Sequence, residues 1–318
     1  ILDSTGCVQK LILNGGRGLS GELPDQVFNL ENLEVLELFG NNLTGTISSG
    51  FENLTKLRSL NLGQNNFHGQ IPTEIGKLSR LNFLNLQNNN LTGNIPIEIF
   101  NFTNLETLSL SYNDLDGNIP NNVGKLINLR NLSFAGNRLN GNIPESINQL
   151  QNLTSLHLEI NHLDGEIPRG ITFLDSLWWV SLWGNNFSGS IPEGFGRLEK
   201  LAILSLNHNQ LSGCIPEDLI SKCRVDVDFN ANPRLPWQGD FSRFCVGEPQ
   251  TGAPCDDSNP YTANDRIRTD CSCAGDTISC RSQDSLTLVA FYQATGGPNW
   301  TVTWDLNQPM DTWFGVKM

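Results

Sequence analysis

The sequence has few positive charges and no long apolar segment. Lys and Arg number 20 against 33 Asp and Glu, which gives a net charge of −13. Nucleic acids and anionic membrane surfaces bind basic faces, so both are excluded as partners. No apolar run reaches the roughly 18 residues that a bilayer requires, so we expect no membrane insertion. The chain starts at Ile1 without a signal peptide, which indicates a processed product or a fragment.

The motifs of common enzymes are also missing. The sequence contains no G-x-S-x-G, H-E-x-x-H or P-loop pattern, and its glycine-rich stretch at 13–18 is a turn before a repeat. His157 and Glu159 fall on one strand face, but no nucleophile or third ligand accompanies them, and we interpret them as solvated. We therefore expect neither enzymatic activity nor a required cofactor.

Cysteine is absent from residues 8–213 and abundant beyond them. The eight cysteines lie at positions 7, 214, 223, 245, 255, 271, 273 and 280. Zinc sites prefer paired C-x2-C spacings with downstream partners, whereas these spacings are irregular and no histidine follows His208. Disulfides, to which we assign Cys214 and Cys245, are the better interpretation, and they indicate an extracellular, oxidising setting.

Leucine recurs with a period of 24 residues. One series of leucines keeps this spacing at 33, 57, 81, 105, 129, 153, 177 and 201, and most of them open an L-x-x-L-x-L pattern. An asparagine follows each at a fixed distance: Asn41, Asn65, Asn89, Asn113, Asn137, Asn161, Asn185 and Asn209. Such self-similarity identifies a leucine-rich repeat solenoid, an α/β-type coil.

The two repeated residue types have distinct physical roles. Alternating leucines predict a short strand with one buried face, and each strand pairs with that of the next turn. Where the chain turns inward, backbone groups would be left unpaired. An asparagine amide both donates and accepts, so a stacked ladder of these side chains can satisfy them.

A second motif, G-x-I-P, follows in most turns, as in Gly69-Gln70-Ile71-Pro72 and Gly93-Asn94-Ile95-Pro96. Together with the leucine pattern it resembles the plant-type leucine-rich repeat class over roughly residues 8–222. The resemblance implies a second short strand after the glycine and a right-handed superhelix with a parallel concave sheet. One turn departs from it, because Ser48 replaces the proline.

The repeats and the change in composition after them predict four regions. Residues 1–222 form the solenoid, with nine repeats and one terminal strand, and residues 223–245 form a C-terminal cap. Residues 246–282 are a small Cys/Asp-rich linker module, resembling short modules of large secreted bacterial proteins. Residues 283–318 form a helical cap, with a short helix at 283–294.

The linker module carries oxygen-bearing side chains of the kind that calcium binds. These are Asp256, Asp257, Asn259, Asn264 and Asp265. The order of an EF-hand is not met, since Arg268 stands where the bidentate glutamate would be. A calcium site and a plain disulfide-stapled linker are both open interpretations.

The last segment closely resembles the N-terminal cap that precedes many secreted leucine-rich repeat arrays. The element Trp313-x-Gly315-Val316 normally runs into a first repeat, and here it ends the sequence. We hypothesise that the chain is one period of a longer molecule, joined head-to-tail with copies of itself, covalently or as subunits. Cys280 and Cys7 would then bracket the cap as a disulfide.

One turn differs from the others on the predicted concave face. Most outward positions are small or polar, but Trp179 and Trp183 both point outward, with Trp178 adjacent. The contact patch that we predict comprises Trp178, Trp179, Trp183, His157, Glu159 and Asn207. Large exposed aromatic side chains mark binding sites for peptides, glycans or another subunit. A cap, a glycan or a neighbouring module that covers the rings is the alternative.

Eight sequons are present, at Asn42, Asn53, Asn90, Asn101, Asn131, Asn152, Asn186 and Asn299. The repeat consensus produces such triplets by itself, so only a eukaryotic secretory pathway would make glycosylation expected.

Two functional interpretations remain. The first is a non-enzymatic extracellular structural or adhesive protein whose modules join head-to-tail into a filament or surface appendage. The second is a receptor-like recognition module that binds a peptide or glycan on its concave face.

Overall fold

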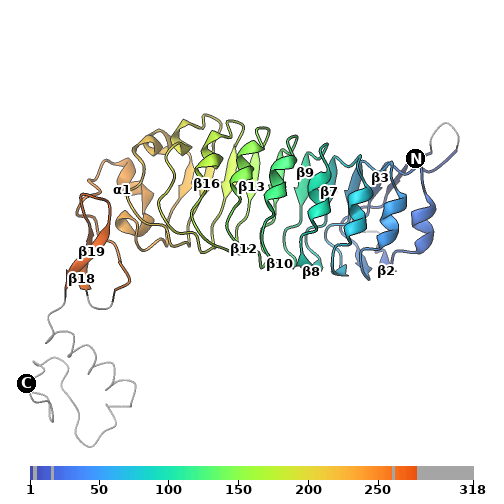
Figure 1. The fold of residues 1–318 in the computed structure, drawn as a ribbon, viewed down its shortest axis with the longest axis horizontal. Coiled ribbons are helices and arrows are strands. Elements are labelled where there is room, and N and C mark those ends of the chain that lie inside the picture. Colours follow the sequence, from blue (N-terminus) through green and yellow to red (C-terminus); the bar gives the residue numbers. More distant parts are fainter. Residues whose placement is uncertain (3–5, 16–17, 260–261, 278–318) are drawn as a thin grey trace, which may run out of the picture.

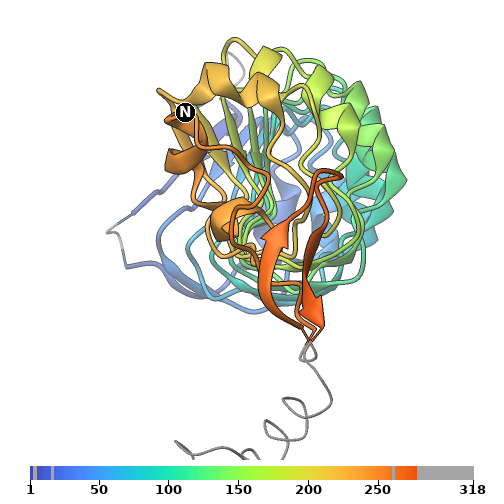
Figure 2. The same ribbon diagram turned by 90° about the vertical axis from the view of Figure 1, so that its left-hand side faces the viewer.

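The computed structural model describes residues 1–2, 6–15, 18–259 and 262–277, which form an elongated coil (Figure 1). Viewed along its length, the coil encloses one continuous core between a long sheet, a row of short helices and a second, discontinuous set of strands (Figure 2). Each turn packs against the turns before and after it, which is the arrangement that the 24-residue period predicts.

One strand from each turn joins a parallel sheet of ten strands, which we call the concave sheet. Leucines of successive turns stand directly opposite one another, as Leu36, Leu60 and Leu84 do, and their side chains are fully buried. The parallel solenoid predicted from the leucine period is confirmed. In sheet order the strands are β1 (Lys10–Ile12), β3 (Val35–Glu37), β5 (Ser59–Asn61), β7 (Phe83–Asn85), β9 (Thr107–Ser109), β11 (Asn131–Ser133), β13 (Ser155–His157), β15 (Trp179–Ser181), β16 (Ile203–Ser205) and β17 (Asp226–Asp228).

A second set of parallel strands is present, but most of them lie before or at the glycine of G-x-I-P, whereas the resemblance implies a strand after it. Glycine is required there: Gly117 has φ +73°, and a Cβ atom on it would lie 2.5 Å from Oδ1 of Asn94 in the preceding turn. The strands are β2 (Ser20–Glu22), β4 (Asn42–Thr44), β6 (His68–Gly69), β8 (Asn90–Asn94), β10 (Asp114–Asp116), β12 (Asn140–Gly141) and β14 (His162–Leu163).

Short 3-10 helices form the remaining side of the coil. Most begin directly after the proline of G-x-I-P, whose fixed φ suits a helix start and whose missing N–H loses no bond there. Consecutive helices pack against one another. They are η1 (Asp25–Asn29), η2 (Ser49–Asn53), η3 (Thr73–Lys77), η4 (Ile97–Asn101), η5 (Asn121–Lys125), η6 (Glu145–Gln149), η7 (Arg169–Phe173), η8 (Phe195–Arg197) and η9 (Glu217–Lys222).

The asparagines stack inside the coil as the predicted ladder. The Nδ2 atom of Asn113 donates to the carbonyl oxygens of Leu110, at 3.0 Å, and of Leu86 in the preceding turn, at 3.1 Å. Its Oδ1 atom accepts from the backbone N–H of Leu91 at 3.0 Å. The same three bonds recur along the ladder, and Asn232 continues it after Asn209. Each side chain therefore joins adjacent turns through backbone groups that would otherwise be unpaired.

Residues 223–245 fold over the last turn. They contain β17, η10 (Pro236–Gly239) and α1 (Phe241–Cys245), and the disulfide Cys223–Cys245 closes this segment. Trp237 is buried, and the Phe241 ring packs at 5.1 Å from that of Phe229. The apolar end of the coil is thus covered by aromatic side chains.

The next segment, predicted as a linker module, is folded against the end of the solenoid. Its described part forms an antiparallel hairpin of β18 (Thr262–Ile267) and β19 (Cys273–Thr277), held internally by Cys255–Cys273. A second disulfide, Cys214–Cys271, links the hairpin to the solenoid. Cys214 and Cys245 therefore belong to two different disulfides and are not bonded to each other. Fixed to the last turn in this way, the hairpin continues the cap.

Several predictions concern residues outside the described part of the chain. These are the helix at 283–294, the cap at 283–318 with Trp313, the sequon at Asn299, and Cys280. The pairing of Cys280 with Cys7 consequently stays a prediction. Among the described residues, no helix has the length and apolar character needed to traverse a bilayer.

Candidate functional site on the concave sheet

The predicted contact patch lies on the outward face of β13, β15 and β16, which are neighbours in the concave sheet. Leu156 and Val180 point into the core, so the residues that alternate with them point outward. Trp178 is 48% exposed, whereas Trp179 and Trp183 are partly buried among their neighbours. Three indole rings from one turn therefore lie on a face that elsewhere carries mostly small or polar side chains.

The tryptophans form two aromatic groups with histidines of the adjacent turns. In the first group, the Trp179 ring centroid lies 4.6 Å from that of His157 and 5.8 Å from that of Trp178, both edge-to-face. In the second, the Trp183 ring lies 6.5 Å from that of His208, which contacts the Asn207 amide at 3.0 Å. The two groups together contain five of the six residues assigned to the patch from the sequence, and Glu159 is the sixth.

Glu159 supplies the acidic group of the patch. Its Oε1 atom lies 3.7 Å from Nδ1 of His157, and the two side chains are 13% and 20% exposed. Its Oε2 atom is buried and has no hydrogen-bond partner among the described residues. The indole Nε1 of Trp179 is likewise buried and has no hydrogen-bond partner among the described residues. Buried polar atoms are normally paired, so an acceptor and a donor within one patch call for partners from outside the fold.

The backbone next to Glu159 has a left-handed residue, as in the other turns. Ile160 has φ +53°, where a β-branched residue is unfavourable. The equivalent position also has positive φ at Gln64, Asn88, Tyr112 and His208, and it is glycine at Gly40, Gly136 and Gly184. This conformation therefore belongs to the repeat and does not mark the patch.

The patch offers side chains that are suited to binding. The aromatic rings offer broad apolar contact, while Glu159 and the Trp179 N–H offer one acceptor and one donor. Ser181, the hydroxyl residue between the two strand tryptophans, is 3% exposed, and no basic residue among the described ones hydrogen-bonds to it. Because nothing in contact activates this hydroxyl, it does not form a nucleophile–base pair.

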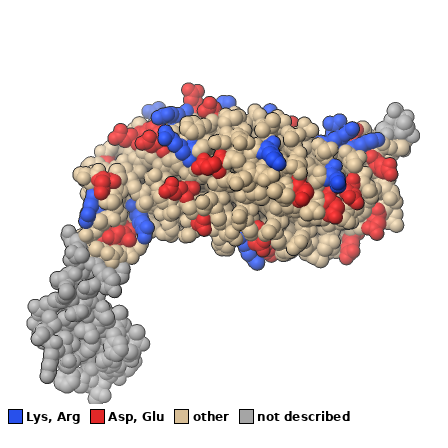
Figure 3. Space-filling view, in the orientation of Figure 1, with Lys and Arg blue, Asp and Glu red and all other residues tan. Residues whose placement is uncertain are grey.

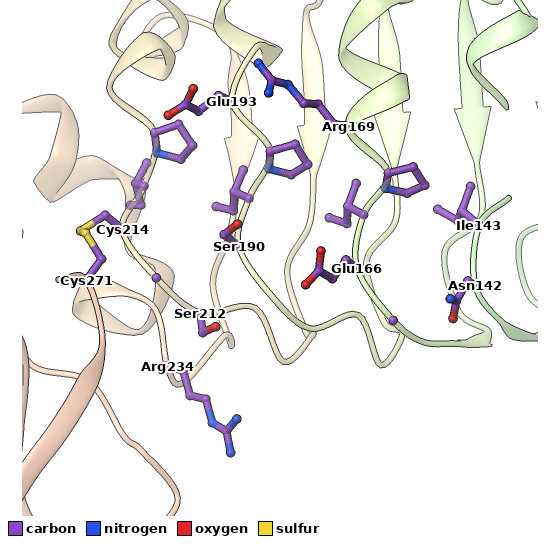
Figure 4. Close-up of a pocket in the computed structure, with 18 of the residues that line it drawn as sticks. Asn142, Ile143, Glu166, Arg169, Ser190, Glu193, Ser212, Cys214, Arg234 and Cys271 are labelled. Atoms are coloured by element: carbon purple, nitrogen blue, oxygen red, sulfur yellow. A yellow bond between two sulfur atoms is a disulfide. The ribbon is translucent and has the colours of Figure 1, made fainter. Parts of the chain in front are cut away.

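A second concavity, which the sequence did not predict, runs along the G-x-I-P side of the solenoid. It encloses about 2000 Å³ and ends at the hairpin, beside the Cys214–Cys271 disulfide (Figure 4). Its walls repeat the motif from turn to turn, with Asn142, Glu166 and Ser190 in one row. Within the G-x-I-P motif, the residue after the glycine varies from turn to turn. That variable position is the one feature of the motif that could have indicated this groove. Because its lining follows the structural consensus, we keep the tryptophan patch as the candidate functional site.

Three of the five residues proposed for calcium lie close together in the hairpin. Carboxylate oxygens of Asp256, Asp257 and Asp265 are within 4.8 Å of one another. A hydrogen bond from the Asn259 backbone N–H, followed by one from Thr262, holds the pKa of Asp257 below its usual value. The Asn264 side chain is exposed, as is that of Asn259. The three carboxylates suit a hard cation, and calcium binding there stays a prediction.

The described sequons all have exposed asparagines. They are Asn42, Asn53, Asn90, Asn101, Asn131, Asn152 and Asn186. Asn131 begins β11 on the concave sheet, and its Oδ1 accepts from Thr154 Oγ1 at 3.1 Å. Asn152 donates to the Ile127 carbonyl oxygen at 2.9 Å. Asn131 and Asn152 therefore already make hydrogen bonds within the protein. At the other described sequons a glycan would only have to extend into solvent.

We expect glycosylation first at Asn42, Asn90 and Asn186 when the chain is secreted from a eukaryotic host. These three occupy equivalent positions just after the ladder asparagine, and all are exposed. Glycopeptide mass spectrometry of the secreted protein should find sugar at each of them, with Asn131 less occupied because of its bond to Thr154. Unmodified peptides at all three positions would contradict this expectation.

On the face shown in Figure 3, basic and acidic side chains of the described residues are interspersed. Several cations are paired with acids on the neighbouring turn, including Arg58 with Glu34 at 3.5 Å and Arg138 with Asp114 at 2.6 Å. The exclusion of nucleic acid stays a prediction from the net charge.

The fold and the patch define a solenoid of the leucine-rich repeat class with a candidate binding surface on its concave sheet. Family models agree: a model described as a leucine-rich repeat region matches residues 26–164, and a leucine-rich repeat model matches residues 176–198 and 200–221. The chain belongs to the leucine-rich repeat family. A search of curated proteins gives no match.

Plant proteins supply the similar structures. The plant peptide hormone receptor RGFR1 in complex with RGF2 has a TM-score of 0.67 and 33% identity, covering 70% of this chain and 36% of the receptor chain. The Arabidopsis receptor kinase HAESA, in complex with the peptide hormone IDA and the co-receptor SERK1, has a TM-score of 0.67 and 35% identity, covering 72% of this chain and 38% of that chain. A plant ice-binding protein has a TM-score of 0.59 and 32% identity, covering 66% of this chain and 67% of its own.

The chain therefore spans between a third and two fifths of the length of these two receptor structures. What the similarity establishes is the repeat architecture.

Proposed function

We propose that this chain is an extracellular recognition module that binds an extended peptide across the concave sheet, centred on the tryptophan patch. The observation that carries the proposal is the set of three indole rings beside Glu159, with a buried donor and a buried acceptor that find no partner in the part of the chain that the structure describes. Aromatic anchors with adjacent unpaired polar atoms are typical of the centre of a protein interface.

Two further observations support the proposal. The structure holds three disulfides, which persist in oxidising compartments. The similar structures include receptors bound to peptide hormones, and one of them is described as an ectodomain. An extended peptide can cross the strands and contact one side chain from each turn.

Head-to-tail assembly into a filament or surface appendage stays a prediction of the sequence. It depends on residues 283–318 and on Cys280, which lie outside the described part of the chain. The comparisons give it no support, and for this reason we place recognition first.

The test is selection from a phage-displayed random peptide library, followed by affinity measurement on a Trp179→Ala, Trp183→Ala double variant. We expect enriched peptides to lose at least about tenfold in affinity for this variant, because two anchor rings at the centre of a site typically contribute more than 1.4 kcal/mol. A matched control is Phe39→Ala, Phe83→Ala. These two rings occupy the same outward positions of earlier turns, and both are partly buried.

Peptides that bind both double variants as tightly as the unaltered protein would remove the patch from the proposal. Failure to enrich any peptide would remove peptide recognition itself. The substituted side chains point away from the leucine core, so we expect each variant to keep the solenoid fold. Circular dichroism of each variant checks this.

A further inference from the structure

We propose that the patch recognises an arginine side chain of the ligand, with the guanidinium held between the Glu159 carboxylate and the tryptophan rings. This inference rests on the proposed function and specifies its ligand. It starts from the Glu159 carboxylate, whose only interaction among the described residues is the 3.7 Å contact with His157. A largely buried carboxylate without a hydrogen-bonded cation is unfavourable, and an incoming cation removes that cost.

Among the described residues, the basic side chain in contact with Glu159 is His157, which is a cation only when it is protonated. The outward side chains of the neighbouring strands are neutral: Asn131 and Ser133 on β11, Trp179 and Ser181 on β15, and Ile203 and Ser205 on β16. Arg130, just before β11, is paired with Glu106 at 3.6 Å. On β17, Asp226 and Asp228 add further negative charge to this end of the sheet. The field over the patch thus favours a positively charged ligand group.

The aromatic rings select the kind of cation. A guanidinium is planar, stacks on indole faces and still donates in its own plane, whereas an ammonium is a strongly hydrated point charge. Trp179 additionally offers an unpaired N–H, which a backbone carbonyl of the same ligand can accept. One arginine residue within a peptide therefore supplies both missing partners, the donor for Glu159 and the acceptor for Trp179.

Access to these atoms requires the movement of one exposed ring. Glu159 Oε2 and Trp179 Nε1 are shielded from water. Trp178 packs edge-to-face on Trp179 at 5.8 Å and is the most exposed of the three indoles, at 48%. Exposed side chains change rotamer rapidly, so this ring can turn aside and then cover the bound guanidinium.

The test uses two short probes, acetyl-Gly-Arg-Gly-amide and its counterpart with citrulline, the neutral isostere of arginine. Binding is followed by NMR at the indole N–H signals of the full chain. We expect the arginine probe to shift the Trp179 signal and to bind at least about tenfold more tightly than the citrulline probe. In the Glu159→Gln variant this preference should disappear.

Glu37→Gln is the matched control, since it removes the same charge from the same face at a distant turn, where Glu37 pairs with Asn14. It should leave the preference for arginine unchanged. Equal binding of the two probes, absence of any shift at millimolar arginine probe, or an unaltered preference in Glu159→Gln would each overturn the inference. If the arginine inference fails in this way but library peptides still require Trp179 and Trp183 for binding, the proposed peptide recognition stands. The failure of the inference is therefore distinguishable from the failure of the proposed function.

Discussion

A Cys223→Ala, Cys245→Ala double variant should lose about 3 kcal/mol of unfolding free energy. The disulfide closes a loop with a sequence separation of 22 residues, and removing it gives the unfolded chain more conformational freedom. The same loop carries Trp237 and Phe241, which cover the end of the core. Chemical denaturation followed by tryptophan fluorescence measures the loss.

The control for this experiment is Ser79→Ala, which alters an exposed side chain in an earlier turn of the solenoid. We expect a change within about 0.5 kcal/mol for it, as for most surface substitutions. A double variant as stable as the unaltered chain would mean that the aromatic packing alone secures the cap.

Replacing Asn113 with alanine should lower the free energy of unfolding by about 1–3 kcal/mol. The substitution removes two bonds to the carbonyl oxygens of Leu86 and Leu110 and one from the N–H of Leu91, all of them buried. The loss falls in the middle of the coil, where neighbouring turns depend on each other.

Asn118→Ala provides the comparison, because that side chain is exposed beside the G-x-I-P strand of the same turn. It should change the unfolding free energy by less than about 0.5 kcal/mol. If both substitutions cost the same, the ladder bonds would not be the source of the stabilisation.

The repeating part of the fold could be predicted because each residue type in the period answers one physical requirement. Alternating leucines fix which strand face is buried, and Asn113 must bond backbone on two turns, so both appear at constant spacing. The outward direction of Trp179 and Trp183 follows from the same alternation. The patch was therefore accessible from the sequence.

The non-repeating part of the fold could not be predicted from the sequence. Spacing alone does not determine which cysteines pair, and Cys214 reaches Cys271 across 57 residues. The hairpin of β18 and β19 has little apolar alternation, because the disulfides hold it where a core normally would. Among the described residues, Glu159 Oε2 and Trp179 Nε1 have no hydrogen-bond partner because of the way three turns pack together. No single segment of the sequence encodes that packing.

The spacing of strands in the concave sheet also determines which residues of a peptide lying across it can contact successive turns. Neighbouring strands are about 4.8 Å apart. An extended peptide in the polyproline II conformation advances about 3.1 Å per residue and presents the same side every three residues. The two spacings coincide after roughly two turns and three residues. A ligand with one residue anchored over β15 thus comes back into step at β17, where Asp226 and Asp228 lie. The residues between are out of step with the sheet, so ligand motifs for this surface should have anchors three positions apart.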